Sequence, residues 1–271
     1  EFGLFVETNL ERSPCLAACL VELDGTIAGS CDATRVEFSE HGRLTTTVKL
    51  DIPTSQQRKL LQLRLSTDQP DIVPVLTLPF NVGPSSQPFY ADFGVQFTCC
   101  RELRFSVGEN SPLAVRMFEA SGSLGIAGKL WDGGAVLLKY LASQPHDQRA
   151  SFRAVELGAG TGALGIGCCG LGFGHVVITD LEEVLCQIRA NVALNERIGL
   201  LRNGQATVAD CTWGRTAPDG AFDLILFADC VYDPDFYGDL LSALLGLAKR
   251  SQSARVLWAH RHRNPEEVGI V

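Results

Sequence analysis

The stretch Ala154-Val-Glu-Leu-Gly-Ala-Gly-Thr-Gly162 constrains the fold of this chain more than any other feature. Its first part, Ala154–Leu157, is typical of a buried strand, and the rest carries glycine at the alternate positions 158, 160 and 162. Glycine adopts positive φ and allows close backbone approach, so these positions predict a tight turn that can wrap a ligand. We expect a helix to follow from Ala163, with its N-terminal amides facing that ligand.

From residue 150 onward, predicted strands and helices alternate. The predicted strands are Ala154–Leu157, His175–Thr179, Gln205–Ala209, Phe222–Phe227 and Arg255–Ala259. The predicted helices between them are Ala163–Gly170, Leu181–Asn195 and Asp235–Arg250. Upstream we expect a strand pair within Gln96–Val107 and a helix over Trp131–Leu141. Strands separated by helices predict an α/β fold, a Rossmann-like, doubly wound and mostly parallel sheet, in which ligands bind beyond the carboxyl ends of the strands.

The first 95 residues have a different pattern. Short alternating apolar runs such as Leu60–Leu65 are separated by prolines, which is typical of a β-rich unit. The best candidate for a linker is Gly83–Pro88. The chain is therefore predicted to contain a β-rich N-terminal extension or accessory domain, residues 1–95, and a ligand-binding α/β domain, residues 96–271.

Composition excludes several classes of protein. The net charge of −8 argues against tight, non-specific binding to nucleic acid. The ten cysteines include no C-x-x-C pair, which favours free thiols in a reducing compartment over a disulfide framework or a metal site. No apolar run reaches the roughly 18 residues that a bilayer span needs. We expect a cytoplasmic protein without membrane association.

The glycine spacing and Asp180 together point to a cofactor that contains adenosine. G-x-G-x-G differs from the dinucleotide fingerprint G-x-G-x-x-G, so another adenosine-bearing cofactor is favoured. Asp180 ends the second strand, where a carboxylate can accept hydrogen bonds from both ribose hydroxyls. The alternative is an N-cap, because Asp before Leu-Glu-Glu is good capping chemistry. The two roles are compatible.

Aromatic and acidic residues mark the ends of the other strands. Trp213 offers a flat apolar surface for an adenine ring, and its alternative is a core tryptophan that closes a long loop. The same two interpretations, contact with a ligand or packing in the core, apply to Trp131. Asp229 and Tyr232 follow the fourth strand, where a carboxylate at the end of a buried strand needs a partner or a task. The alternative is that Asp229 caps a turn.

Other polar residues have structural interpretations. Asn191 and Asn195 lie on one face of a predicted helix, and a helix C-cap explains Asn195. His260 and His262 have no acidic or cysteine partner at ligand spacing, so a solvated tail is favoured over a metal site.

Five ordered motifs resemble a known family. They are Gly128–Ala135, Glu156–Gly162, Thr179-Asp180, Trp213-Gly214 and Ala228–Tyr232. The series resembles the class I, seven-β-strand methyltransferases that use S-adenosylmethionine, and more narrowly the protein-lysine methyltransferases with a D-x-x-Y motif after the fourth strand. The resemblance covers about residues 96–260. It is greatest, through Thr179–Glu183 and Ala228–Cys230, to the branch that methylates valosin-containing protein, which implies a chaperone or AAA-type ATPase as partner.

The resemblance implies S-adenosyl-L-methionine as cofactor and a lysine side chain of a protein as substrate. It implies cofactor contacts at Trp131, Glu156, Gly158, Gly160, Asp180, Trp213 and Ala228, with no metal. Asp229 and Tyr232 are then expected to line the substrate channel as catalytic residues. Because a bare carboxylate raises the pKa of a nearby lysine, we expect Asp229 to orient the amine rather than act as a strong base.

Two alternatives to protein-lysine methylation remain open at this point. One is methylation of a small, nicotinamide-like amine by the same fold, and the other is a non-catalytic protein that binds S-adenosylmethionine. The family fold also continues after its fifth strand with a helix and an antiparallel two-strand hairpin. We expect these C-terminal strands to be missing here, which would leave an exposed sheet edge.

Overall fold

The computed structural model describes residues 2–7, 15–22, 27–30, 34–35, 43–48, 60–67, 75–76, 78–81, 89–107, 111–145, 149–202 and 204–261. The chain forms two compact units, one of Glu1–Ala91 with Cys99–Glu102 and the other of Asp92–Thr98 with Leu103–Val271. The division into domains at residue 95 stays a prediction, and the candidate linker Gly83–Pro88 lies outside the described residues.

The first unit is built from strands, as expected for a β-rich extension. Its central antiparallel pair is β2 (Cys15–Glu22) with β6 (Leu60–Thr67). Four short strands join this pair: β3 (Ile27–Ser30), β4 (Thr34–Arg35), β7 (Val75–Leu76) and β8 (Phe80–Asn81). A separate antiparallel pair is formed by β1 (Phe2–Glu7) and β5 (Arg43–Val48). A short 3-10 helix, η2 (Phe89–Phe93), follows the strands.

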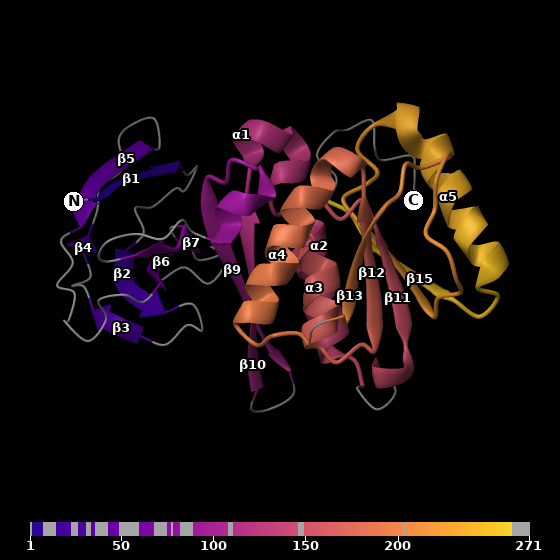
Figure 1. The fold of residues 1–271 in the computed structure, drawn as a ribbon, viewed down its shortest axis with the longest axis horizontal. Coiled ribbons are helices and arrows are strands. Elements are labelled where there is room, and N and C mark those ends of the chain that lie inside the picture. The colour runs from indigo at the N-terminus through magenta and orange to yellow at the C-terminus, as the bar shows by residue number, and fades with distance from the viewer. Residues whose placement is uncertain are drawn as a thin grey trace. The chain divides into compact units, whose positions relative to one another are not determined.

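The second unit contains a parallel sheet of five strands in the order β13-β12-β11-β14-β15 (Figure 1). The strands are β11 (Arg153–Leu157), β12 (His175–Asp180), β13 (Ala206–Asp210), β14 (Leu224–Ala228) and β15 (Arg255–Ala259). All four pairings are parallel. The order reverses between β11 and β14, which places a crevice at the carboxyl ends of these two central strands. The predicted Rossmann-like α/β architecture is confirmed.

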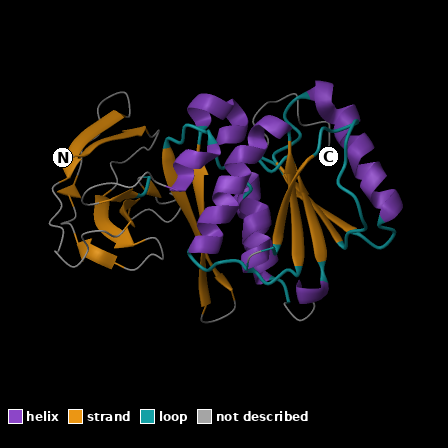
Figure 2. Cartoon of the chain, in the orientation of Figure 1, coloured by secondary structure: helices purple, strands orange, loops and turns teal. Residues whose placement is uncertain are grey.

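Helices cover both faces of this sheet (Figures 1 and 2). One face carries α2 (Asp132–Ser143), α3 (Ala163–Gly170) and α4 (Leu185–Arg197), and the other carries α5 (Tyr237–Arg250). Successive residues of β14 illustrate the arrangement, because Leu224 and Leu226 join the core under α2 to α4 whereas Ile225 and Phe227 join the core under α5. Strands that are buried on both faces need continuous apolar runs, which is why this region was predictable.

Upstream of the sheet, one expectation is wrong. We expected a strand pair within Gln96–Val107, but β9 (Cys99–Val107) is a single strand, and its partners are β10 (Ser111–Glu119) and β7. Within β9 itself no residue type favours a turn, so the sequence offered no reason to divide this segment into two strands. β10 packs against α3 and α4. It leads into α1 (Ser121–Leu124) and the 3-10 helix η3 (Gly125–Gly128).

Helix boundaries differ from the predictions by a few residues. The helix expected from Leu181 begins with the 3-10 turn η5 (Glu182–Val184) and then becomes α4. The helix expected from Asp235 likewise begins with the 3-10 turn η6 (Pro234–Phe236) before α5. None of the helices described here is both long and apolar enough to cross a membrane.

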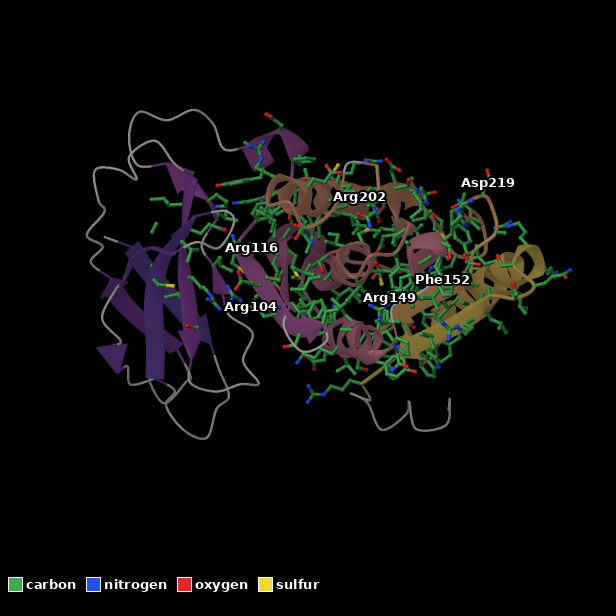
Figure 3. The ribbon with its side chains drawn as sticks, turned by 90° about the horizontal axis from the view of Figure 1, so that it is seen from below. Arg104, Arg116, Arg149, Phe152, Arg202 and Asp219 are labelled. Carbon is green, nitrogen blue, oxygen red and sulfur yellow. The ribbon has the colours of Figure 1, made fainter. Side chains whose placement is uncertain are left out.

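A buried arginine joins the ends of two helices on the α2–α4 side. Arg149, labelled in Figure 3, lies in the 3-10 helix η4 (Arg149–Ser151) and is almost fully buried. Its guanidinium donates hydrogen bonds to the carbonyl oxygens of Leu141, Gln144 and Leu171, which lie at the C-terminal ends of α2 and α3. A cation at these positions satisfies carbonyls that lack helical partners and complements the helix dipoles.

Candidate functional site

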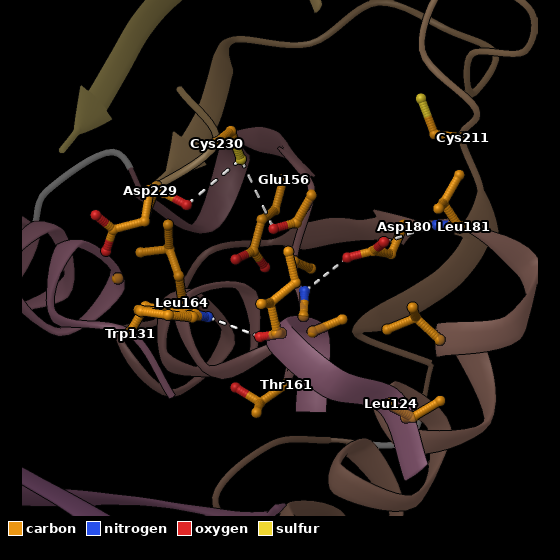
Figure 4. A pocket seen from close by; sticks show the side chains of 18 of the residues that line it. Leu124, Trp131, Glu156, Thr161, Leu164, Asp180, Leu181, Cys211, Asp229 and Cys230 are labelled. Carbon is orange, nitrogen blue, oxygen red and sulfur yellow. Dashed lines mark hydrogen bonds between the residues drawn. The ribbon is translucent and has the colours of Figure 1, made fainter. Parts of the chain in front are cut away.

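A pocket of about 710 Å³ opens at the carboxyl ends of the parallel strands (Figure 4). Its lining includes every residue that the sequence singled out for the site: Trp131, Glu156, Gly158, Gly160, Asp180, Trp213, Ala228, Asp229 and Tyr232. These residues come from β11, β12 and β14, from the segments that follow β11, β13 and β14, and from the segment that precedes α2. The structure therefore brings together groups that are about 100 residues apart along the chain.

The glycine turn has the predicted backbone conformation. Gly158, Gly160 and Gly162 have φ of 60°, 55° and 76°, and α3 begins at the next residue. The space beside these glycines is filled by protein. A Cβ on Gly158 would lie 2.7 Å from Cys230 Sγ, and one on Gly160 would lie 3.2 Å from the carbonyl oxygen of Ala127. The absent side chains thus allow neighbouring segments to pack against the turn and form the pocket walls.

Asp180 is held at the pocket by two backbone amides. Its Oδ2 accepts from the Gly160 amide at 2.7 Å, and its Oδ1 accepts from the Leu181 amide at 2.8 Å. Burial raises the pKa of Asp180, although the two amide hydrogen bonds oppose that rise. The alternative N-cap role is wrong, because the N-cap position of η5 belongs to Leu181 and no side chain caps it. The Asp180 carboxylate thus accepts one hydrogen bond from the glycine turn and one from the residue that follows its own strand, and its contact with ribose hydroxyls stays a prediction.

Glu156 lies beneath the turn and is fully buried. Its Oε2 accepts from the Gly165 amide at 2.8 Å, near the start of α3. Burial, together with the nearby charge of Asp180, raises the pKa of Glu156 to about 8, while the Gly165 hydrogen bond lowers it. The Glu156 carboxyl group is therefore largely protonated at neutral pH.

Glu156 should make stability depend on pH. A carboxyl group whose pKa rises from 4.5 in the unfolded chain to about 8 in the folded one binds its proton more tightly when folded. Its stabilising contribution is thus complete below the unfolded pKa and is lost as pH rises through about 8. The melting temperature of the wild type should fall relative to that of Glu156→Gln across this range. The exposed Glu182→Gln variant should follow the wild type, and parallel curves for the wild type and Glu156→Gln would contradict the expectation.

Trp131 forms one wall of the pocket, just outside the helix that it was expected to begin. It is the extended N-cap residue of α2, and its Nε1 donates to the Ile126 carbonyl at 2.7 Å. The Lys129 ammonium lies 4.1 Å from the centre of the indole ring. These contacts fix the ring between η3 and α2, which explains its position on the pocket wall.

Trp213 packs against the core and also lines the pocket, and its contact with an adenine ring stays a prediction. It is partly buried against the core under α5, and a Cβ on Gly158 would lie 2.9 Å from its ring. It also lines the pocket. The indole therefore packs against the glycine turn and still presents surface to a ligand.

Asp229 has a strained backbone and a carboxylate that two backbone amides hold in place. It is the only non-glycine residue with a positive φ, 53°, in the described part of the chain. Its Oδ2 accepts from the Gly133 amide at 2.6 Å and its Oδ1 from the Arg261 amide at 3.1 Å. Such strain is retained at functional sites when surrounding contacts hold it. Asp229 does not simply cap its own turn, because it ties the end of β14 to the start of α2 and to the segment after β15.

Tyr232 lies at the open side of the pocket, where 45% of the residue is exposed. Partial burial raises the pKa of its hydroxyl, so Tyr232 is neutral at physiological pH. A neutral phenol can both donate and accept a hydrogen bond.

The expectation of a solvated tail at His260 is wrong. Only 5% of its side chain is exposed, and its Nδ1 lies 3.7 Å from Asp229 Oδ1. Its ring is nearly parallel to that of Trp258, with 6.4 Å between centroids. His262 lies outside the described residues. Within the described ranges, no group of three or more histidine, cysteine or acidic residues could hold a metal ion.

The sequence motifs contain two residues that shape the site, Gly133 and Cys230, to which no individual role was assigned. Gly133 must lack a side chain, because a Cβ there would lie 2.6 Å from Asp229 Oδ2. Cys230 is buried beside the turn, and its Sγ lies 3.5 Å from the Leu157 carbonyl oxygen. For Gly133, the sequence contains one indication, the Gly133-Gly134 pair near the start of a predicted helix.

Comparison with known proteins identifies the family. A family model described as "Lysine methyltransferase" matches residues 109–269, which include the whole lining of the pocket. The chain belongs to this lysine methyltransferase family. S-adenosyl-L-methionine is the methyl donor of such enzymes, in agreement with the adenosine-bearing cofactor expected from the sequence.

Curated members of the lysine methyltransferase family match part of the chain. It is 38% identical over 133 residues to protein N-lysine methyltransferase METTL21A of Danio rerio, covering 48% of this chain and 59% of that protein. It is 32% identical over 170 residues to EEF1A lysine methyltransferase 3 of Xenopus tropicalis, covering 62% and 68%. The chain thus spans less than two thirds of the METTL21A relative.

The chain is less similar to solved structures than to these curated proteins. The glycopeptide N-methyltransferase MtfA complexed with S-adenosyl-L-methionine is 19% identical, with a TM-score of 0.37 over 51% of this chain and 57% of that one.

Proposed function

We propose that this chain is an S-adenosyl-L-methionine-dependent protein-lysine N-methyltransferase. The observation that carries the proposal is the convergence of the glycine turn, Asp180, Trp213 and the Asp229–Tyr232 pair on one pocket. Its volume of about 710 Å³ falls in the range of roughly 300–1,000 Å³ that is usual for cofactor and ligand pockets. Membership of the lysine methyltransferase family supports the same reaction.

The residues present suit this cofactor. Asp180 offers a buried carboxylate for the ribose hydroxyls, and Trp213 and Trp131 offer aromatic surfaces on the pocket walls. Gly158, Gly160 and Ala228 supply backbone close to the ligand. We assign Glu156 an indirect role, because its carboxyl group holds the Gly165 amide beneath the turn. The bound cofactor would supply an activated methyl group, and these residues would orient it.

The open end of the pocket suits a lysine side chain. A lysine must lose its proton before its nitrogen can attack, against a solution pKa of about 10.4. Partial desolvation between Tyr232 and the pocket walls lowers that pKa, whereas the Asp229 carboxylate raises it. The amides of Gly133 and Arg261 hold the Asp229 carboxylate in place, and Asp229 lines the pocket. We therefore assign Asp229 to orienting the amine, with the Tyr232 hydroxyl or ring face beside it.

The substrate that we propose is a protein, with a chaperone or AAA-type ATPase as the first class to test. The names of the relatives, protein N-lysine methyltransferase and EEF1A lysine methyltransferase, support a protein substrate. We place the activity in the cytoplasm, which is consistent with eight free cysteines among the described residues.

Calorimetry with S-adenosylhomocysteine tests the cofactor assignment. The wild type should bind, and Asp180→Ala should weaken binding by about tenfold or more, since a buried charge-assisted hydrogen bond contributes about 1.5–3 kcal/mol. Asp210→Ala is the matched control, because Asp210 pairs with Asp180 in the register of β12 and β13 but does not line the pocket. Absence of binding, or equal affinities for the two variants, would refute the assignment.

Transfer of labelled methyl groups tests the substrate class. Label should enter proteins of a cell lysate and release methyl-lysine on hydrolysis. Label that enters only a metabolite extract would establish methylation of a small amine instead. Cofactor binding without label in either fraction would establish a non-catalytic binding protein.

A further inference from the structure

Two asparagines lie buried on the inner face of α4, four residues apart. Neither Asn191 nor Asn195 has any exposed surface. Asn195 was expected to cap the helix C-terminus, but α4 continues to Arg197 and its C-cap residue is Ile198. The C-cap interpretation is therefore wrong. Buried amides need partners, because an unsatisfied one costs about 1–3 kcal/mol.

The side-chain amide of each asparagine pairs with the backbone N–H and C=O of one β10 residue, as the backbone of a neighbouring strand would. Asn195 Oδ1 accepts from the Arg116 amide at 3.1 Å, and its Nδ2 donates to the Arg116 carbonyl at 2.5 Å. One turn earlier, Asn191 Oδ1 accepts from the Phe118 amide at 2.6 Å, and its Nδ2 donates to the Phe118 carbonyl at 3.2 Å. The two asparagines thus hold alternate residues of β10 in the same way.

Each asparagine donates one further hydrogen bond, and the acceptor of that bond differs between the two. Asn195 Nδ2 donates to the Asn191 carbonyl of its own helix, at 2.7 Å. Asn191 Nδ2 donates to the carbonyl of Thr161 at 2.8 Å, within the glycine turn. Thr161 lines the pocket, as Figure 4 shows, and stands between Gly160 and Gly162. Asn191 alone of this pair therefore connects β10 to the pocket.

The turn needs external support because its glycines have wide conformational freedom. The Gly160 amide donates to Asp180, and the Gly162 amide donates to the Ala159 carbonyl at 2.8 Å. The bond from Asn191 fixes the peptide plane between Thr161 and Gly162. Without it the buried Thr161 carbonyl would lose that donor, and the turn would relax away from its present conformation.

We propose that Asn191 is a positioning residue for the cofactor pocket, which holds the glycine turn in its binding conformation through the Thr161 carbonyl. The inference rests on the proposed function, because it assumes that the cofactor binds at this turn. Asn191 does not line the pocket, so it acts through the backbone of the turn and not by touching the ligand.

The test compares Asn191→Ala with Asn195→Ala. Each variant loses two equivalent hydrogen bonds to β10, so both should lower the melting temperature by similar amounts. Only Asn191→Ala should weaken binding of S-adenosylhomocysteine, by about tenfold, measured by calorimetry well below both melting temperatures. The serine variants at the two positions provide the same comparison if the alanine variants do not fold. Equal affinities for the two variants would overturn the proposal.

Hydrogen exchange in the ligand-free protein separates this proposal from the proposed function. The amides of residues 159–164 should exchange faster in Asn191→Ala than in Asn195→Ala, whether or not the cofactor binds. Equal exchange in the two variants would overturn the positioning role. Failure of the wild type to bind S-adenosylhomocysteine would refute the proposed function and leave the exchange result to decide the role of Asn191.

Discussion

Gly133→Ala is expected to reduce methyl transfer about a hundredfold or more and to lower the free energy of unfolding by about 2–4 kcal/mol. The added Cβ would lie 2.6 Å from Asp229 Oδ2 and 3.0 Å from the Ala259 carbonyl oxygen. One neighbour is backbone and the other is a buried carboxylate held by two amides, so neither can move freely. Displacement of the Asp229 carboxylate would misplace the group that we propose orients the lysine amine. Single-turnover methyl transfer and urea unfolding measure the two effects.

The next residue of the same helix provides the control. A Cβ on Gly134 would meet no atom within 4 Å. Alanine is favoured over glycine within a helix by about 1 kcal/mol, so Gly134→Ala should unfold at the same or a higher urea concentration than the wild type. Because Gly134 lines the pocket, only its unfolding is compared. Equal unfolding free energies for the two variants would show that the bond between Asp229 and α2 contributes little.

Gly158→Ala is expected to weaken binding of S-adenosylhomocysteine by about a hundredfold or more, the effect of losing roughly 2.7 kcal/mol. Two causes act together. The residue has a φ of 60°, where a Cβ costs about 1–2 kcal/mol, and that Cβ would lie 2.7 Å from Cys230 Sγ and 2.9 Å from the Trp213 ring. The indole of Trp213, which we propose contacts the adenine ring of the cofactor, would have to move. Calorimetry of the folded variant measures the change.

Gly199→Ala is the control that separates the effect of backbone strain from the effect of moving the Trp213 indole. Gly199 has a φ of 77° and open space where a Cβ would lie. Its alanine variant should therefore be less stable than the wild type by about 1–2 kcal/mol but should bind with unchanged affinity. Wild-type affinity in Gly158→Ala would mean that Trp213 does not contribute to the cofactor site.

The alternating part of the fold was predictable because its signals are local. The predicted helix Ala163–Gly170 and strand Arg255–Ala259 agree with α3 and β15 to the residue. Buried parallel strands leave apolar runs in the sequence, and glycine or aspartate marks their ends. The glycine turn, Asp180, Trp213 and the Asp229–Tyr232 pair were proposed for the same reason, since ligands of such a sheet bind at the carboxyl ends of the strands. Glu156 and Ala228 came from the family resemblance, and all nine candidate site residues line the pocket.

The errors concern contacts between distant segments. β10 was not predicted as a strand, and its hydrogen bonds at Arg116 and Phe118 go to asparagine side chains more than 70 residues away. His260 follows a predicted strand and was expected to be solvated, yet it packs beside Asp229. Neither periodicity nor turn chemistry contains information about such partners.

The sequence by itself determined the parallel sheet, the glycine turn, the acidic residue after the second strand and the resemblance to methyltransferases. These features depend on local backbone preference and on hydrophobic periodicity, which are properties of short segments. Only the tertiary structure decided that Asp229 joins α2 to the end of β15, that Gly158 makes room for Trp213, and that Asn191 connects β10 to the turn. Each of these depends on the close packing of segments that are distant in sequence, where a single methyl group or amide decides which arrangement fits.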